Sequence, residues 1–192
     1  MSEPLLGVVD DARAVDGATR EGLLRCWVDV TDAGGAVGFP FPPVTPEQVA
    51  PALDALLAGL APSGSRLVVA ADAGGVAGWV HLARGSGPLT AHWGTVERLQ
   101  SRPERRGQGV GRALLARLEA VARDELGLEH LWLVLRGGLG LEAFYERRGW
   151  QVAGVHRGAL RLAPDDTRDE VLMQRLLTGG PAAGRAGRPP AP

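Results

Sequence analysis

The sequence predicts an α/β domain with a mixed β-sheet, and three observations lead to that fold class. Residues 109–127 repeat apolar side chains at helical spacing over a long stretch. Residues 130–136, HLWLVLR, are apolar on both faces, which is typical of a strand buried in the middle of a sheet. Shorter strand-like runs lie before and after this pair, so the expected order of elements is β, α, α, β, β, β, α, β, α, β, β.

One strand and two helices are expected in the N-terminal part of the chain. The apolar run LLGVV at 5–9 can form the strand, and residues 18–30 place leucine, tryptophan and valine side chains at helical spacing. A second helix follows Thr45, which can cap it while Gln48 closes a capping box. Pro51 falls inside this helix and is expected to kink it.

Beyond the second helix, from Arg66 on, the helical spacing of apolar residues ends. Residues 66–72 and 76–83 flank a Gly-Gly turn and predict a β-hairpin. A third strand of the sheet is expected at 92–101. The long helix at 109–127 follows it, and Gly127 is the expected cap of that helix.

The C-terminal part is expected to add a short helix and two strands to the sheet. The helix is placed at 139–148, and the strands at 149–157 and 169–177. The last stretch, 179–192, reads GGPAAGRAGRPPAP and has nothing to bury, so we expect a disordered tail there. The folded domain is therefore expected to span residues 1–178.

The composition excludes several classes of protein. With 45% apolar residues and a formal net charge of −1, the chain is neither wholly disordered nor a polybasic nucleic-acid binder. No apolar run approaches the ~20 residues of a membrane span, and the N-terminus lacks the pattern of a signal peptide, so a soluble cytoplasmic protein is expected. The single cysteine, Cys26, cannot form an internal disulfide, and the four histidines are too scattered to predict a metal site.

The stretch RRGQGVGRALL at 105–115 holds three glycines at every second position, where the long helix begins. Each glycine gives up about 0.5–1 kcal/mol relative to alanine in a regular element, so the pattern indicates a ligand that lies against the backbone. Free N–H groups and the positive end of the helix dipole favour a phosphate or pyrophosphate there. A Walker loop is excluded because the chain has no lysine, and a dinucleotide fingerprint because Arg112 stands where its third glycine should be.

The pattern that fits is Arg106-x-x-Gly109-x-Gly111, with L-x-x-x-P before it from Leu99 and EAFYERRGW after it at 142–150. Together these motifs resemble the GCN5-related N-acetyltransferases (GNAT), over about residues 5–177. The resemblance implies a single domain whose mostly antiparallel sheet of about six to seven strands is flanked by about four helices. Within that superfamily, GGAVGF, EAFY and the stretch around the glycine loop are most similar to the tabtoxin-resistance type of small-molecule acetyltransferase.

The same resemblance implies acetyl-CoA as the acyl donor and no metal. The pyrophosphate would lie on the backbone amides of the glycine loop, and the pantetheine arm would pair with the strand before it. The residues expected to bind CoA are therefore Leu99, Gln100, Ser101, Arg106, Gly107, Gln108, Gly109, Val110, Gly111 and Arg112.

Two side chains are candidates for catalysis on the same basis. Tyr145, the only tyrosine, would donate a proton to the departing CoA thiolate or at least hydrogen-bond its sulfur, since a phenol of pKa ~10 can serve as a donor to the thiolate of a thiol near ~8.5. Its alternative role is packing beside Phe144. Strand alternation puts Thr95, Glu97 and Leu99 on one face, and if that face lines the cleft, Glu97 lies near the acetyl carbonyl. Glu97 would then help to deprotonate the amine; its alternative role is an ion pair with an arginine.

Five further residues are candidates for the acceptor site. Phe39 and Phe41, in the Gly/Pro-rich loop after the first helix, suit a lid over a small acceptor or a plain connection. The tabtoxin-resistance type is expected to carry a glutamate where this chain has Thr95, and one acidic residue late in the next strand, where this chain reads Val134-Leu135-Arg136. Either Glu97 takes over the role of these acidic residues, or the acceptor differs from that of the tabtoxin-resistance type, or catalysis is weak.

The function expected from the sequence is acetyl transfer from acetyl-CoA to a primary amine of a small molecule, such as an antibiotic or an amino-acid-like toxin. The amine would attack directly within a ternary complex. One alternative is a CoA-binding sensor or structural protein that has lost turnover. Another is a protein or peptide N-acetyltransferase, which should have an open groove beside the Gly/Pro-rich loop. No nucleic-acid or membrane partner is expected, and the chain would act as a monomer or homodimer.

Overall fold

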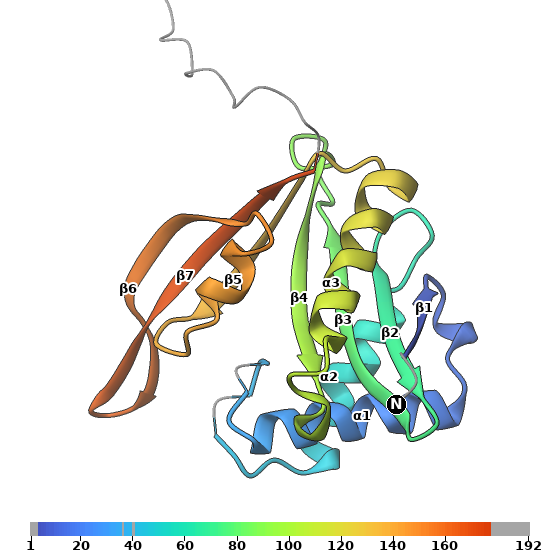
Figure 1. Cartoon of the computed structure of the whole chain (residues 1–192), viewed down its shortest axis with the longest axis horizontal. Coiled ribbons are helices and arrows are strands. Elements are labelled where there is room, and N and C mark those ends of the chain that lie inside the picture. The colour runs from blue at the N-terminus through green and yellow to red at the C-terminus, as the bar shows by residue number, and fades with distance from the viewer. Residues whose placement is uncertain (1–3, 36, 40, 178–192) are drawn as a thin grey trace, which may run out of the picture.

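The computed structural model describes residues 4–35, 37–39 and 41–177, and Figure 1 shows the course of the chain. Seven strands form one sheet in the order β1-β2-β3-β4-β5-β7-β6. Neighbouring strands are antiparallel except for β4 and β5, which are parallel. The predicted α/β fold with a mixed, mostly antiparallel sheet is confirmed. The tail predicted at 179–192 lies outside the described residues.

The strands are β1 (Leu5–Val9), β2 (Arg66–Asp72), β3 (Gly75–Arg84), β4 (Trp93–Ser101), β5 (His130–Arg136), β6 (Gln151–Ala163) and β7 (Asp166–Leu176). The helices are α1 (Gly17–Asp32), α2 (Pro46–Ala58), α3 (Val110–Ala120) and α4 (Glu142–Glu146). Short 3₁₀ turns span Ala12–Ala14 and Pro103–Arg105, and a π-helical turn at Val121–Glu125 continues α3.

Helices pack on both faces of the sheet because alternate residues of β2 and β3 point to opposite sides. On one face, α1 and α2 bury Trp27 and Leu53 in a cluster with Trp79 of β3. On the other, α3 buries Leu114 and Leu118 in a second cluster, which also includes residues of β4, β5, β7 and α4. The sheet thus divides the interior into two apolar layers.

Strands β4 and β5 pair over a short length only. Residues Trp93, Gly94 and Thr95 of β4 face residues 130–132 of β5, and the pairing stops there. Beyond that point the two strands diverge, which Figure 1 shows as the opening between the green and orange parts of the sheet. Backbone groups along the diverging edges are therefore free to meet a ligand.

A β-bulge interrupts β4. Trp79 pairs with Gln100, but His81, two residues along β3, pairs with Glu97, so β4 holds one extra residue. Arg98 lies at this bulge and has a φ of 54°. No other non-glycine residue in the described part of the chain has a positive φ. A left-handed conformation of this kind costs about 1–2 kcal/mol in a residue with a Cβ.

The bulge overturns the expected alternation along β4. Leu99 packs against the apolar cluster on the α3 side, together with Val96. Glu97 bonds instead to His81, which lies on the same face of β3 as Trp79 and α1. Glu97 and Leu99 therefore do not share a face, contrary to the prediction, because the extra residue reverses the alternation between them.

The other predicted elements occur, with shifted bounds. α2 runs unbroken through Pro51, and the helix predicted at 109–127 changes to π-helical hydrogen bonding after Ala120. α4 is shorter than predicted because Gly138 and Gly140 adopt positive φ and hold the residues before it in a turn. β6 is longer than predicted, and it pairs with β7 as far as Ala163.

Candidate functional site

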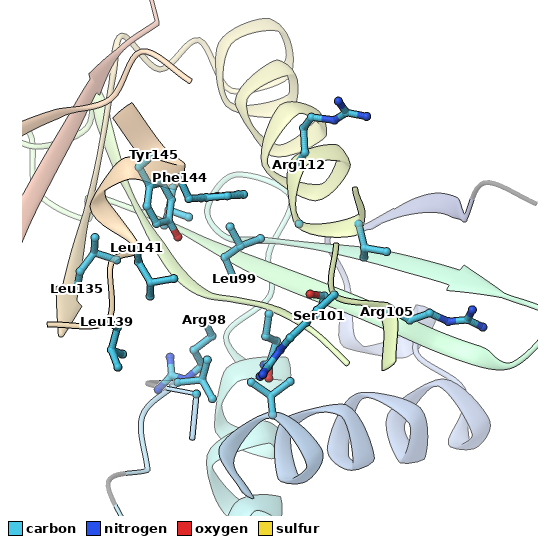
Figure 2. Close-up of a pocket in the computed structure, with 18 of the residues that line it drawn as sticks. Arg98, Leu99, Ser101, Arg105, Arg112, Leu135, Leu139, Leu141, Phe144 and Tyr145 are labelled. Atoms are coloured by element: carbon cyan, nitrogen blue, oxygen red, sulfur yellow. The ribbon is translucent and has the colours of Figure 1, made fainter. Parts of the chain in front are cut away.

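A cavity of about 930 Å³ lies where β4 and β5 diverge (Figure 2). Its lining comes from the end of α1 and the following loop, β4, the glycine loop, the first turn of α3, β5, and α4 with its flanking residues. Most of the predicted CoA-binding and catalytic residues thus meet around one space. They are Leu99, Gln100, Ser101, the whole of 106–112, and Tyr145.

The glycine loop presents its backbone to this cavity. Gly107 and Gly109 have φ values of 76° and 85°, and Gly109 is the N-cap of α3 without any capping side chain. The first hydrogen bond of the helix runs from the N–H of Ala113 to the carbonyl of Gly109 at 2.9 Å. The N–H groups of the preceding helical residues have no partner within the helix, so they and the helix dipole form an anion site.

Gly111 differs from the other two glycines of the motif. It has an ordinary helical conformation, and a Cβ built on it would lie 3.8 Å from Cζ of Phe144, an ordinary van der Waals contact. The positive φ values therefore favour glycine at 107 and 109. At 111 the backbone makes no such demand, and the missing side chain leaves more room in the cavity that Gly111 lines.

The charge of the cavity lining is positive. Its charged side chains are Arg98, Arg105, Arg106, Arg112 and Arg148, and within the described residues no carboxylate or histidine lines it. Arg105 is paired with Asp72, with Nη2 and Oδ2 2.8 Å apart. A cavity with this charge suits a polyanionic ligand.

Tyr145 is held on α4 with its hydroxyl directed into the cavity (Figure 2). Its ring makes edge-to-face contacts with Phe144 and Trp150, at centroid distances of 5.0 and 5.7 Å, and the residue is only 6% exposed. Burial raises the pKa of Tyr145 well above its usual value, against a smaller opposing effect of Arg148. The phenol therefore stays protonated and can act as a donor at neutral pH.

Glu97 does not line the cavity, and its surroundings differ from those of a general base. Oε2 accepts hydrogen bonds from Nδ1 of His81 and Nη1 of Arg98, both at 3.1 Å. The bond from His81 is the largest of the effects that lower the pKa of Glu97; Arg98 lowers it further, and burial opposes both. A carboxylate with a lowered pKa is a weaker base, and this geometry favours a role in holding Arg98 in place.

Of the five acceptor-site candidates, the structure brings Val134 to the cavity. Phe39 packs edge-on against Trp27, 5.5 Å between ring centroids, and Phe41 is 61% exposed. The described residues that line the cavity do not include these two phenylalanines, and they do not include Thr95 or Arg136. The lid proposed from the two phenylalanines therefore has no support from their positions.

Other lining residues were not predicted from the sequence. They include Val30, Ala33, Gly34, Gly35 and Val37 of α1 and the loop after it, Arg98 of β4, and Leu139 and Leu141 before α4. The GGAVGF motif pointed to the loop after α1 but not to its role as a wall. For Arg98 and the two leucines the sequence carried no signal, because their positions depend on the bulge and on the divergence of β4 and β5.

The described residues contain no cluster of three histidine, cysteine, aspartate or glutamate side chains that could hold a metal ion. None of the helices described combines the length and the apolar character that crossing a membrane requires.

Comparison with known proteins agrees with the geometry of the cavity. The model of the Acetyltransferase (GNAT) family matches residues 19–150. No curated protein sequence matches the chain.

Many solved structures share this fold. A protein provisionally named a phosphinothricin N-acetyltransferase is 21% identical, with a TM-score of 0.71 over 91% of this chain and 99% of its own. The ribosomal-protein-alanine N-acetyltransferase of Brucella melitensis is 20% identical, with a TM-score of 0.70 over 90% and 99%. yncA of Salmonella typhimurium, solved with its cofactor acetyl-CoA, is 16% identical, with a TM-score of 0.71 over 96% and 100%. At these identities the likeness establishes the fold.

Proposed function

Because the chain belongs to the acetyltransferase (GNAT) family, we propose that it uses acetyl-CoA to acetylate a primary amine of a small molecule. The observation that carries the proposal is the cavity itself, which joins an anion-binding helix N-terminus to the hydroxyl of Tyr145. Similarity to the tabtoxin-resistance type favours an antibiotic or an amino-acid-like toxin as the acceptor.

The residues around the cavity fit acetyl-CoA. Gly107 and Gly109 leave the backbone open to a pyrophosphate, and Arg106 and Arg112 stand beside it on the same loop. At residues 99–101 of β4, alternate backbone groups point away from β3 towards the diverging gap, where the amide groups of the pantetheine arm can pair with them. When bound, acetyl-CoA supplies an acetyl group activated as a thioester and a thiolate leaving group.

The chain's own groups have three tasks in the transfer. The hydroxyl of Tyr145 hydrogen-bonds the departing sulfur and donates a proton to it. Burial keeps the phenol protonated but, because it raises the pKa, also makes the phenol a weaker acid. Backbone N–H groups of β4 that face the gap stabilise the developing oxyanion. The cavity walls hold the amine against the carbonyl, which alone removes much of the barrier to a bimolecular reaction.

Direct attack by the amine is supported by the make-up of the described cavity lining, which holds no thiol or imidazole to accept the acetyl group. Cys26, a residue of α1, is fully buried, and neither cysteine nor histidine is among the lining residues that the structure describes. Initial-rate kinetics with both substrates varied test this point. Intersecting double-reciprocal lines are expected, and parallel lines would indicate an acetylated enzyme.

A second candidate function is CoA binding without turnover. The observation that favours it is the lack of a carboxylate or histidine among the described lining residues to accept the proton of the amine. Release of free thiol from acetyl-CoA, measured against a panel of small amines and of peptides with free N-termini, separates the candidates. Thiol release with small amines supports the first proposal, release with peptides only supports a peptide acetyltransferase, and CoA binding without release supports the second candidate.

A further inference from the structure

Arg98 lines the cavity at a place apart from the arginines of the glycine loop. Figure 2 shows its side chain on the side of Leu139, away from Arg105 and Arg112. The lining also includes apolar residues of α1 and the loop after it, of β5 and of the stretch before α4: Val30, Ala33, Val37, Val134, Leu139 and Leu141.

The position of Arg98 is fixed by contacts that do not depend on a ligand. Its guanidinium carbon lies 5.0 Å from the ring centroid of Trp27, and Nη1 donates to Oε2 of Glu97 at 3.1 Å. The loop after α1 passes close by at Gly38, where an added Cβ would lie 3.7 Å from Nε. The positive φ of Arg98 turns its side chain towards this place, and a strained conformation in a cleft points to a functional constraint.

The guanidinium of Arg98 is only partly satisfied. It has five N–H donors, and within the described residues the structure gives it one hydrogen bond, to Glu97. Nε is shielded from solvent and has no partner among the residues described. Because Glu97 itself does not line the cavity, the face that Arg98 presents to the cavity is cationic and keeps unused donors.

We infer that Arg98 binds an anionic group of the acceptor, so that the substrate is an amine that also carries a carboxylate, phosphinate or phosphonate. A planar guanidinium matches these oxyanions in a fork of two hydrogen bonds, and apolar walls strengthen the pair by excluding water. The inference rests on the proposed acetyl transfer, and it names the chemical class of the acceptor. Arg98 would act by selecting and orienting the acceptor, not by moving a proton.

Matched pairs of amines test this inference. 4-Aminobutyrate is compared with 4-aminobutanamide, and 3-aminopropylphosphonate with 3-amino-1-propanol. The ratio of kcat/KM within each pair is measured for the wild type and for Arg98→Gln, so that differences in the intrinsic reactivity of the amines cancel. We expect Arg98→Gln to lower the ratio by at least ~10-fold, mainly through KM of the anionic amine, as expected for the loss of a charged hydrogen-bond donor.

Two further variants separate recognition from structure. Arg98→Lys keeps the charge and should restore part of the preference, whereas the control Arg25→Gln removes an exposed arginine paired with Glu21 and should leave the ratio unchanged. All three variants should bind CoA as the wild type does. A ratio that is the same in Arg98→Gln and the wild type overturns the inference.

A failure of the proposed function gives a different result. If neither pair is acetylated, 4-aminobutyrate and 3-aminopropylphosphonate are titrated calorimetrically into the CoA-bound protein. Binding that the wild type and Arg25→Gln share and Arg98→Gln lacks supports the anion site even without turnover. Absence of binding to the wild type overturns it.

Discussion

Nδ1 of His81 and Oε2 of Glu97 lie 3.1 Å apart across β3 and β4, directly beside the bulge at Arg98. The same oxygen of Glu97 also accepts from Arg98. One carboxylate therefore ties the strained residue to the neighbouring strand, and its ionised form is the one that the folded state stabilises.

Glu97→Gln is expected to destabilise the fold slightly, and only where the carboxylate is ionised. The pKa of Glu97 is lowered in the folded state, so its contribution to the free energy of unfolding is present above its ordinary pKa of 4.5 and is lost as the pH falls below that value. Since the side chain is 36% exposed, the effect at pH 7 should be on the order of 0.5 kcal/mol. Urea unfolding at pH 7 and pH 3.5 measures it; Glu21→Gln is the control, and an equal loss at both pH values would contradict the assignment.

Cys26 is expected to be unreactive in the folded protein. It is fully buried, and burial raises the pKa of its thiol to about 12, so almost no thiolate forms near neutral pH. A chromogenic disulfide reagent should therefore find no thiol in the native chain and one thiol per chain in denaturant. A rapid reaction in the native state would contradict the packing of α1. If Cys26 is unreactive, the thiol detected in the acetyl-CoA assay comes from released CoA alone.

Much of the fold could be predicted because its signals are local. The apolar stripes of α1, α2 and α3 come from helix faces that are buried on one side, which leaves a periodic pattern in the sequence. Strands β2 and β3 are buried along most of their length, so they stand out as short apolar runs on either side of a Gly-Gly turn. The glycine loop could be predicted for a similar reason, because its requirement for positive φ is met by glycine within a few residues.

The bulge at Arg98 could not be located from the sequence. Val96 and Leu99 in TVERLQS are three residues apart, which does not fit the two-residue repeat of a regular strand, but this spacing alone does not show where the extra residue lies. The register of β4 is set by pairing with β3, and the pairing is a non-local property. The prediction that Glu97 and Leu99 share the face that lines the cavity is wrong for this reason, because it assumed that side chains alternate without interruption along β4. The β6 and β7 hairpin was also underestimated, because much of β6 is exposed and leaves little periodic pattern.

Tyr145→Phe is expected to lower kcat by ~10-fold or more if the hydroxyl is the proton donor. The ring keeps its edge-to-face contacts with Phe144 and Trp150, so stability and the affinity for CoA should change little. Steady-state rates with saturating acetyl-CoA and a good amine acceptor, together with a thermal unfolding curve, make the measurement. An unchanged kcat would leave Tyr145 with a packing role only.

Gly109→Ala and Gly75→Ala form a matched pair that tests the glycine loop. The two glycines have similar φ values, 85° and 93°, so each substitution should cost a similar amount of stability, about 1–2 kcal/mol. Gly75 is the first residue of β3 and does not line the cavity, whereas Gly109 does, and a Cβ at 109 would lie 3.4 Å from Nη2 of Arg112.

Only Gly109→Ala should therefore weaken CoA binding, and we expect at least a tenfold rise in Kd, roughly 1.4 kcal/mol, from the loss of close approach to the backbone. Calorimetric titration with CoA measures both variants under the same conditions. If Gly109→Ala binds CoA as tightly as Gly75→Ala does, the anion does not lie on this loop. If both variants lose affinity in parallel with their stability, the effect belongs to folding, and the loop has no special part in binding.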